Sequence, residues 1–150
     1  KVTDILRIKG HTLYSAAPDQ PLLEAVQAMS EKDLGSLVVI EQGRLVGMLT
    51  FREVIQVLVQ HQGSLGPVQV RQAMVKNPQV CHPETELDEV RRLMLDHHER
   101  YMPVLDQGEL MGVISFYDVA KSIVESQNFE NKMLKAYIRD WPQGQSGQGE

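Results

Sequence analysis

The chain has 150 residues, 42% of them apolar and 23% charged, which is typical of a globular protein long enough to bury a core. Its formal net charge of −5 argues against a nucleic-acid partner, because such partners are usually bound through a basic face. The sequence has no run long enough to span a membrane and no signal peptide, and its single cysteine, Cys81, suits a reducing compartment, so we expect a cytoplasmic protein without a membrane partner.

Short helices and strands alternate in the first half of the chain, according to the spacing of apolar residues and the positions of turns. Asp19 and Pro21 predict a helix start, with Asp19 as the cap and Pro21 in the first turn. Thr50 is expected to open a second helix directly after a hairpin. The expected elements are, in order, a helical turn (residues 1–10), a strand (11–16), a helix (from 21 to about 33), two strands (36–40 and 45–49) and a helix (from 50 to about 60).

The second half of the chain repeats the first with an offset of 65 residues. The clearest echo is the segment Gly47–Glu53, which recurs as Gly112–Asp118, and the offset holds without an insertion from Pro18 to Val54. An internal repeat is therefore expected, with the order β-α-β-β-α in each copy.

One such unit buries little surface by itself, so we expect two copies to pack sheet to sheet about a pseudo-two-fold axis and to share one core. The predicted fold class is α+β with a C-terminal helical extension. The expected boundaries are residues 1–61 for the first repeat with its N-terminal segment, 62–69 for a linker, 70–125 for the second repeat, 126–141 for the C-terminal helix and 142–150 for a flexible tail rich in Gln, Gly and Ser.

The C-terminal helix carries an apolar stripe that the repeats do not need for their own packing. A partner subunit is the expected target, so the sequence predicts a homodimer. The stripe consists of Phe129, Met133, Leu134, Tyr137 and Ile138.

The repeated strings Thr50-x-x-Glu53 and Ser115-x-x-Asp118 have a structural and a functional interpretation. Taken alone, each fits a capping box, in which the hydroxyl and the acid satisfy the first amides of a helix. Each also lies where a strand turns into a helix, so that the hydroxyl and free amides can hold a phosphate or ribose oxygen. The acid can accept hydrogen bonds from the paired hydroxyls of a ribose, and apolar strands nearby can sandwich a purine.

Together, the repeats, the two Gly-x-x-Ser/Thr-x-x-acid strings and the segment Val70–Pro78 resemble a tandem of cystathionine-β-synthase (CBS) domains, a Bateman module. The resemblance covers residues from about 3 to 125 and is closest to small bacterial proteins made of one CBS pair. It implies regulatory binding of an adenine nucleotide (AMP, ADP, ATP, or sometimes NAD or S-adenosylmethionine) without catalysis, and an unknown protein target that responds to the ligand.

The resemblance also implies two clefts, each built from both repeats. We name them after their acids, the Asp118 cleft and the Glu53 cleft. The Asp118 cleft is expected to contain Ser115, Tyr117, Asp118, Ile8, Lys9, His11, Leu34, Gly35 and Ser36. The Glu53 cleft is expected to contain Thr50, Arg52, Glu53, Met74, Val75, Pro78, Val80, Glu99, Arg100 and Tyr101.

Two residues of the Glu53 cleft depart from the family pattern. Glu53 replaces the usual Asp, and Val80 stands where a hydroxyl residue is common, so ribose binding there is in doubt. Arg52 and Arg100 can hold a phosphate. We therefore expect the Asp118 cleft to be the better nucleoside site and the Glu53 cleft to be weak, vacant or suited to another anion.

Other chemistries have little support in the sequence. Adjacent His97 and His98 point in different directions on a helix, so we expect no metal site. Cys81 has no evident base, and we expect the protein not to be an enzyme. The alternative to ligand binding is a structural or interaction module in which the repeated strings only cap helices.

Overall fold

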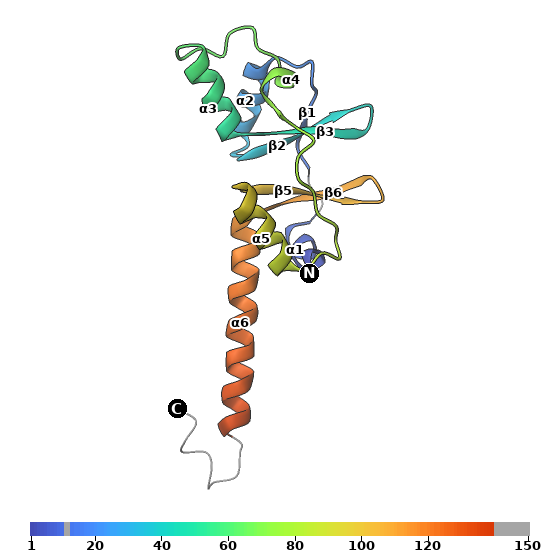
Figure 1. Ribbon diagram of the computed structural model, residues 1–150, viewed down its shortest axis with the longest axis vertical. Helices are drawn as coiled ribbons and strands as arrows, with labels where there is room; N and C mark the ends of the chain where they lie inside the picture. The colour runs from blue at the N-terminus through green and yellow to red at the C-terminus, as the bar shows by residue number, and fades with distance from the viewer. Residues whose placement is uncertain (11–12, 140–150) are drawn as a thin grey trace.

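The computed structural model describes residues 1–10 and 13–139 of the chain. His11, Trp141 and the tail at 142–150 therefore lie outside the described residues. The fold consists of two β-α-β-β-α repeats stacked one above the other (Figure 1). The first repeat comprises β1 (Ser15–Ala16), α2 (Leu22–Glu31), β2 (Ser36–Glu41), β3 (Arg44–Thr50) and α3 (Phe51–Gln60), and the second comprises α5 (Leu87–His97), β5 (Tyr101–Asp106), β6 (Glu109–Ser115) and α6 (Phe116–Arg139).

Three short elements precede or connect the repeats. They are α1 (Val2–Lys9), α4 (Val70–Ala73) and β4 (Val75–Lys76). β4 completes a first sheet of order β1-β2-β3-β4, in which only β1 and β2 are parallel. β5 and β6 form the second sheet, and a parallel bridge from Cys81 to Val104 takes the place of the β1–β2 pairing. The predicted strand over residues 11–16 is thus limited, among the residues described, to Ser15–Ala16.

The two hairpins are built alike, as the internal repeat predicts. In each, the turn has two residues with positive φ, Gln42-Gly43 in the first and Gln107-Gly108 in the second. Two positive φ values match the twist of adjoining antiparallel strands, which favours a tight hairpin. Each hairpin also has a register shift at the same place, after Val39 in β2 and after Val104 in β5.

The sheets face each other, and each repeat has its own core on the opposite side of its sheet (Figure 1). Side chains alternate between the two faces of a strand, so Val39 of β2 packs in the first core while the neighbouring Val38 lies on the facing side. Val38 is 1% exposed and Met48 is 4% exposed, so these side chains on the facing sides are buried as well. Sheet-to-sheet packing of the repeats is confirmed, but the expected single shared core is wrong.

Helix α1 belongs to the core of the second repeat, although it precedes the first repeat in the chain. Its buried residues Val2, Ile5 and Leu6 pack with the α5, β5, β6 and α6 side chains. The Thr3 hydroxyl donates a hydrogen bond to the Pro83 carbonyl at 2.7 Å, which ties α1 to that repeat. α4 packs in the first core in the same way, so the connecting helices are exchanged between the repeats.

The glycines of the repeated segment permit this close packing. A Cβ atom on Gly112 would lie 2.8 Å from the Leu6 side chain of α1. A Cβ atom on Gly47 would lie 2.5 Å from the sulfur of Met74, directly after α4. Only a residue without a side chain allows these contacts.

The start of α2 differs from the prediction. Pro21 is the residue before the helix and not part of its first turn, and no side chain caps the helix. Asp19 instead pairs with Arg71 at 2.8 Å, and Arg71 also pairs with Glu41 at 2.9 Å. An Asp three residues before the first residue of a helix is a weak signal for a cap when a cation, here Arg71 of α4, can reach it.

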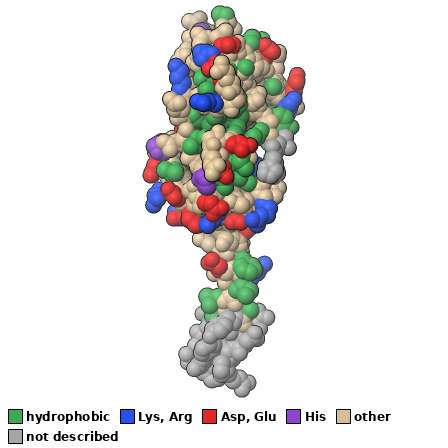
Figure 2. All heavy atoms as spheres, turned by 90° about the vertical axis from the view of Figure 1, so that its right-hand side faces the viewer, with side chains coloured by type: hydrophobic (Ala, Val, Ile, Leu, Met, Phe, Trp, Pro, Cys, Tyr) green, Lys and Arg blue, Asp and Glu red, His purple; other side chains and the backbone are tan. Residues whose placement is uncertain are grey.

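The predicted C-terminal helix is present as a direct continuation of the last helix of the repeat. α6 runs without a break from Phe116 to Arg139, and its second half projects away from both repeats (Figure 1). Hydrophobic side chains are gathered on this projecting part, where Phe129, Met133 and Leu134 are each more than half exposed (Figure 2). None of the described helices combines the length and the apolar character needed to cross a membrane.

Candidate functional site

Both repeated strings form capping boxes at the corner between a strand and a helix. In the second repeat, the Ser115 amide donates to Asp118 Oδ2 at 2.9 Å, and the Asp118 amide donates to Ser115 Oγ at 3.1 Å. In the first repeat, the amide and the hydroxyl of Thr50 both donate to Glu53 Oε1 at 2.7 Å. The capping geometry expected from the sequence is therefore present in both copies.

The two acids differ in their remaining surroundings. Lys9 Nζ at the end of α1 lies 2.8 Å from Asp118 Oδ2 and 3.2 Å from the Val113 carbonyl oxygen. Within the described residues, Asp118 Oδ1 has no hydrogen-bond partner, and the side chain retains 20% exposure. Glu53 is 4% exposed, and its longer side chain is folded back onto Thr50. Asp118 thus presents a free acceptor atom, while Glu53 is enclosed.

Lys9 also sets the charge state of Asp118. Partial burial by itself raises the pKa of Asp118, but hydrogen bonds from Lys9 and the Ser115 amide, together with the charge of Lys9, outweigh burial. The pKa of Asp118 is therefore lowered below its usual range, and the group is a carboxylate at neutral pH.

This lowered pKa predicts a pH-dependent contribution to stability. Because the pKa of Asp118 is lower in the folded than in the unfolded chain, the carboxylate stabilises the fold above the unfolded-state value, and the effect is lost as the pH falls through the folded-state value. The difference in free energy of unfolding between wild type and Asp118→Asn should be largest near neutral pH and shrink below about pH 4. Urea unfolding at several pH values measures it. When both proteins also carry Lys9→Met, this difference should depend less on pH. A difference between wild type and Asp118→Asn that does not change with pH would contradict the lowered pKa of Asp118.

A cavity of about 250 Å³ lies between the repeats beside this corner. Neither Ser115 nor Asp118 lines it, but Lys9 does, and Lys9 Nζ bonds the Asp118 carboxylate, which is thus one contact away. Its walls are mainly apolar or backbone. The lining residues are Leu6, Lys9, Gly10, Leu13, Tyr14, Asp33, Leu34, Gly35, Ser36, Val38, Tyr101, Gly112 and Val113.

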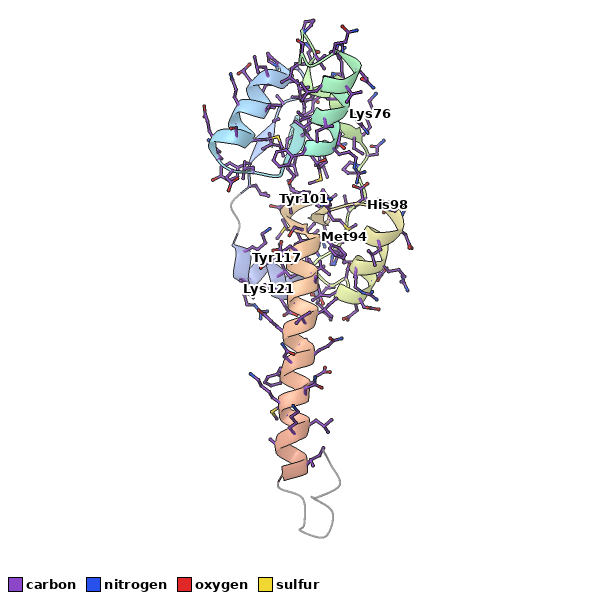
Figure 3. The ribbon with its side chains drawn as sticks, turned by 90° about the vertical axis from the view of Figure 1, so that its left-hand side faces the viewer. Lys76, Met94, His98, Tyr101, Tyr117 and Lys121 are labelled. Atoms are coloured by element: carbon purple, nitrogen blue, oxygen red, sulfur yellow. The ribbon has the colours of Figure 1, made fainter. Side chains whose placement is uncertain are left out.

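The structure brings only part of the predicted Asp118 cleft to this cavity. Lys9, Leu34, Gly35 and Ser36 line it. Ile8 does not, because it points outward from α1 and is 84% exposed. Tyr117, in the first turn of α6, is 70% exposed and does not line the cavity either (Figure 3).

The corresponding space beside Glu53 is almost closed, at about 10 Å³. Thr50, Glu53, Val75, Pro78, Glu99 and Tyr101 of the predicted Glu53 cleft do meet there. Met74 is instead packed against Gly47, and Val80 does not line the space. The two clefts are therefore related by the repeat but differ in the volume that they leave open.

The two arginines predicted for the Glu53 cleft line a separate cavity of about 380 Å³. Arg52 Nη2 donates to the His98 carbonyl, and Arg100 also lines this cavity. Thr50, Glu99 and Tyr101 line both this cavity and the small space beside Glu53. The predicted cleft is thus divided into a closed part beside the acid and an open part with two cations.

Several residues that line the cavity of about 250 Å³ were not among those predicted for the Asp118 cleft. Leu13 and Tyr14 come from the extended segment after α1, and Tyr101 was assigned to the other cleft. Nothing in their pattern indicates a cavity, because the segment has neither periodicity nor a motif. Gly112 had a signal, since it opens the repeated segment.

Metal and nucleophile chemistry find no support among the described residues. No group of three or more His, Cys, Asp or Glu side chains in residues 1–10 and 13–139 is placed to hold a metal ion. Burial raises the pKa of the Cys81 thiol to about 12, so this thiol is not a nucleophile at neutral pH.

Comparisons with known proteins agree with the two-repeat fold described above. A family model described as CBS domain matches residues 3–60 and 70–125. The CBS domain-containing protein YhcV of Bacillus subtilis is 31% identical over 114 residues, which are 76% of this chain and 81% of YhcV. The structure of a putative signal-transduction protein with CBS domains from Burkholderia ambifaria superposes with a TM-score of 0.78 at 31% identity, covering 84% of this chain and 95% of that one. CBSX2, solved in complex with AMP, gives a TM-score of 0.67 at 22% identity, with 83% and 96% covered.

Proposed function

The chain belongs to the CBS-domain family, and from this premise we propose that it is a regulatory module that binds an adenine nucleotide in the Asp118 cleft. The observation that carries the proposal is the Asp118 carboxylate, whose Oδ1 has no hydrogen-bond partner among the described residues and which lies one contact, through Lys9, from a cavity between the repeats. A carboxylate oxygen in that position accepts hydrogen bonds from ribose hydroxyls. The complex of CBSX2 with AMP supports adenosine-type ligands in this fold.

The cavity suits the base and the ribose of such a ligand. Leu13, Val38 and Val113 supply apolar contacts for the two faces of a purine ring. Asp118 accepts from the ribose through Oδ1, while its Oδ2 stays bonded to the Ser115 amide. Lys9 is then free to turn from the carboxylate toward a phosphate, because its side chain is 41% exposed and flexible.

The experiment that tests the proposal is a calorimetric titration of the purified protein with AMP, ADP, ATP and NAD. We expect saturable binding of at least one of them. The absence of binding by all four at millimolar concentration would leave only the alternative, an interaction module in which the two strings cap helices. In that case Asp118→Ala should lower stability by about 1 kcal/mol and change nothing else.

A regulatory role without catalysis is part of the proposal. The raised pKa of Cys81 rules out its thiol as a nucleophile at neutral pH, and no group of three or more His, Cys, Asp or Glu side chains in the described residues is placed to hold a metal ion. Chromatographic analysis of ATP incubated with the protein should therefore show no ADP or AMP above the buffer control. The readout of binding would be a change in the arrangement of repeats or subunits that a protein target in the cytoplasm recognises.

We also propose that the module is a homodimer. The exposed apolar residues of α6 supply an interface, and α3 adds Phe51, Ile55 and Val59, each more than half exposed. Exposed apolar side chains gathered on one part of a surface, as on the projecting half of α6, usually mark a protein contact.

A charge placed in this surface should weaken the dimer. Phe129→Lys is expected to shift the protein toward monomer at micromolar concentration, because the ammonium group would lose water in the interface. Asn128→Lys adds the same charge about 100° away on the helix and should leave the dimer intact. Sedimentation velocity measures both. A wild-type monomer, or equal masses for the two variants, would contradict the proposal.

A further inference from the structure

The repeat makes the two clefts comparable residue by residue, and one pair of equivalent residues that line the two spaces differs by an aromatic ring. Ser36 opens β2 and pairs with Thr50, while Tyr101 opens β5 and pairs with Ser115. They therefore occupy equivalent positions on either side of the pseudo-two-fold axis. Ser36 lines the open cavity beside Asp118, and Tyr101 lines the nearly closed space beside Glu53.

Tyr101 lies where the two repeats meet (Figure 3). Among the described residues, it alone lines the cavity of about 250 Å³, the arginine-lined cavity of about 380 Å³ and the space of about 10 Å³. Its side chain is therefore part of the wall of all three spaces.

Gly35 leaves the space that the Tyr101 ring occupies. A Cβ atom on Gly35 would overlap the hydroxyl of Tyr101, so only glycine lets the ring lie across the start of β2. The equivalent of Gly35 in the second repeat is Arg100, which leaves no such seat for a ring at position 36. A ring packed against a glycine in this way is therefore present only beside the Glu53 cleft and not beside the Asp118 cleft.

We propose that Tyr101 closes the Glu53 cleft and so limits this chain to one nucleoside site. The inference rests on the proposed function for its ligand, an adenine nucleotide, but not for the closure itself. Val75 is the main competing cause, since it replaces Gly10 at the equivalent wall of the closed space and pairs with Met48 through β4. A valine adds three carbon atoms, whereas the change from serine to tyrosine adds a whole ring.

The ligand test makes the Glu53 cleft resemble the Asp118 cleft. In calorimetric titrations with AMP, Glu53→Asp with Tyr101→Ser should bind two molecules per chain, whereas wild type, Glu53→Asp alone and Glu53→Asp with Tyr101→Phe should each bind one. Glu53→Asp with Val75→Gly should also bind one, because the ring remains. A second site in any of the three variants that keep the ring, or only one site after Tyr101→Ser, would overturn the proposal. If wild type binds no AMP, the proposed function fails, and the closure is decided by the second test.

The second test needs no ligand. Val75→Cys places a thiol in the closed space, and native Cys81 gives little background because it is 7% exposed and its pKa is raised to about 12. Alkylation of the introduced thiol by iodoacetamide should be about tenfold faster with Tyr101→Ser than with Tyr101 or Tyr101→Phe, because only the serine opens a path. Equal rates in the three backgrounds would overturn the closure whatever the protein binds.

Discussion

Replacing Asp118 with alanine is expected to lower the affinity for AMP by about 100-fold, because two hydrogen bonds from ribose hydroxyls to a carboxylate contribute about 3 kcal/mol. The same change removes half of a capping box, which costs only about 1 kcal/mol of stability. Binding and stability therefore respond with different magnitudes. Calorimetric titration and urea unfolding of the same preparation measure both.

The control for this prediction is Asp88→Ala. Asp88 ends a third Ser/Thr-x-x-acid string, Thr85-x-x-Asp88, but it pairs with Arg91 on the surface at 2.8 Å and lines none of the three cavities. AMP affinity should be unchanged in this variant. If Asp118→Ala binds AMP as tightly as wild type, the carboxylate is only a helix cap and the site is elsewhere.

The largest expected effect on stability comes from Ile5, which lies before the first repeat but is 4% exposed in the core of the second. Ile5→Ala should lower the free energy of unfolding by about 2–5 kcal/mol, since it leaves a cavity among well-packed side chains. Urea unfolding measures the loss. Hydrogen exchange should show the loss of protection first in β5 and β6, the strands against which α1 packs.

Ile8 is the matched control on the same helix. It is 84% exposed, so Ile8→Ala should change the stability by less than about 0.5 kcal/mol. If Ile5→Ala is equally mild, α1 is not part of the second core. In that case the exchange of connecting helices between the repeats would be wrong.

Most of the fold could be predicted because the sequence contains an internal repeat. The offset of 65 residues gave the element order, the hairpins and the sheet-to-sheet arrangement before any contact was known. The exchange of α1 and α4 could not be predicted. Both helices are short, and their apolar residues fit either core equally well, so only tertiary packing decides which repeat they join.

The core partition also depends on information that the repeat does not carry. A strand that is buried on both faces has no alternation, and β2 with Leu37, Val38 and Val39 is such a strand. The sequence of β2 indicates that both faces of the strand are buried. It does not indicate that helices cover one face and the second sheet covers the other. We therefore expected one core where the structure has two.

In the candidate site, the capping boxes at the strand-to-helix corners could be predicted from the sequence. The residues that line the cavities could be predicted only in part. The capping boxes follow from local spacing, and both are present. The pairing of Lys9 with Asp118 joins residues 109 positions apart and has no local signal. The division of the Glu53 cleft arises from the size of Tyr101 and the absence of a side chain at Gly35, which only the folded chain brings together.

The central claim is that an adenine nucleotide binds with its ribose on Asp118. A crystal structure of the protein grown with AMP tests it most directly. The account predicts AMP in the cavity beside Gly112 and Val113, with ribose hydroxyls on Asp118 Oδ1, Lys9 turned away from the carboxylate and the Glu53 cleft empty. AMP bound beside Glu53, or bound with its ribose away from both acids, would contradict it.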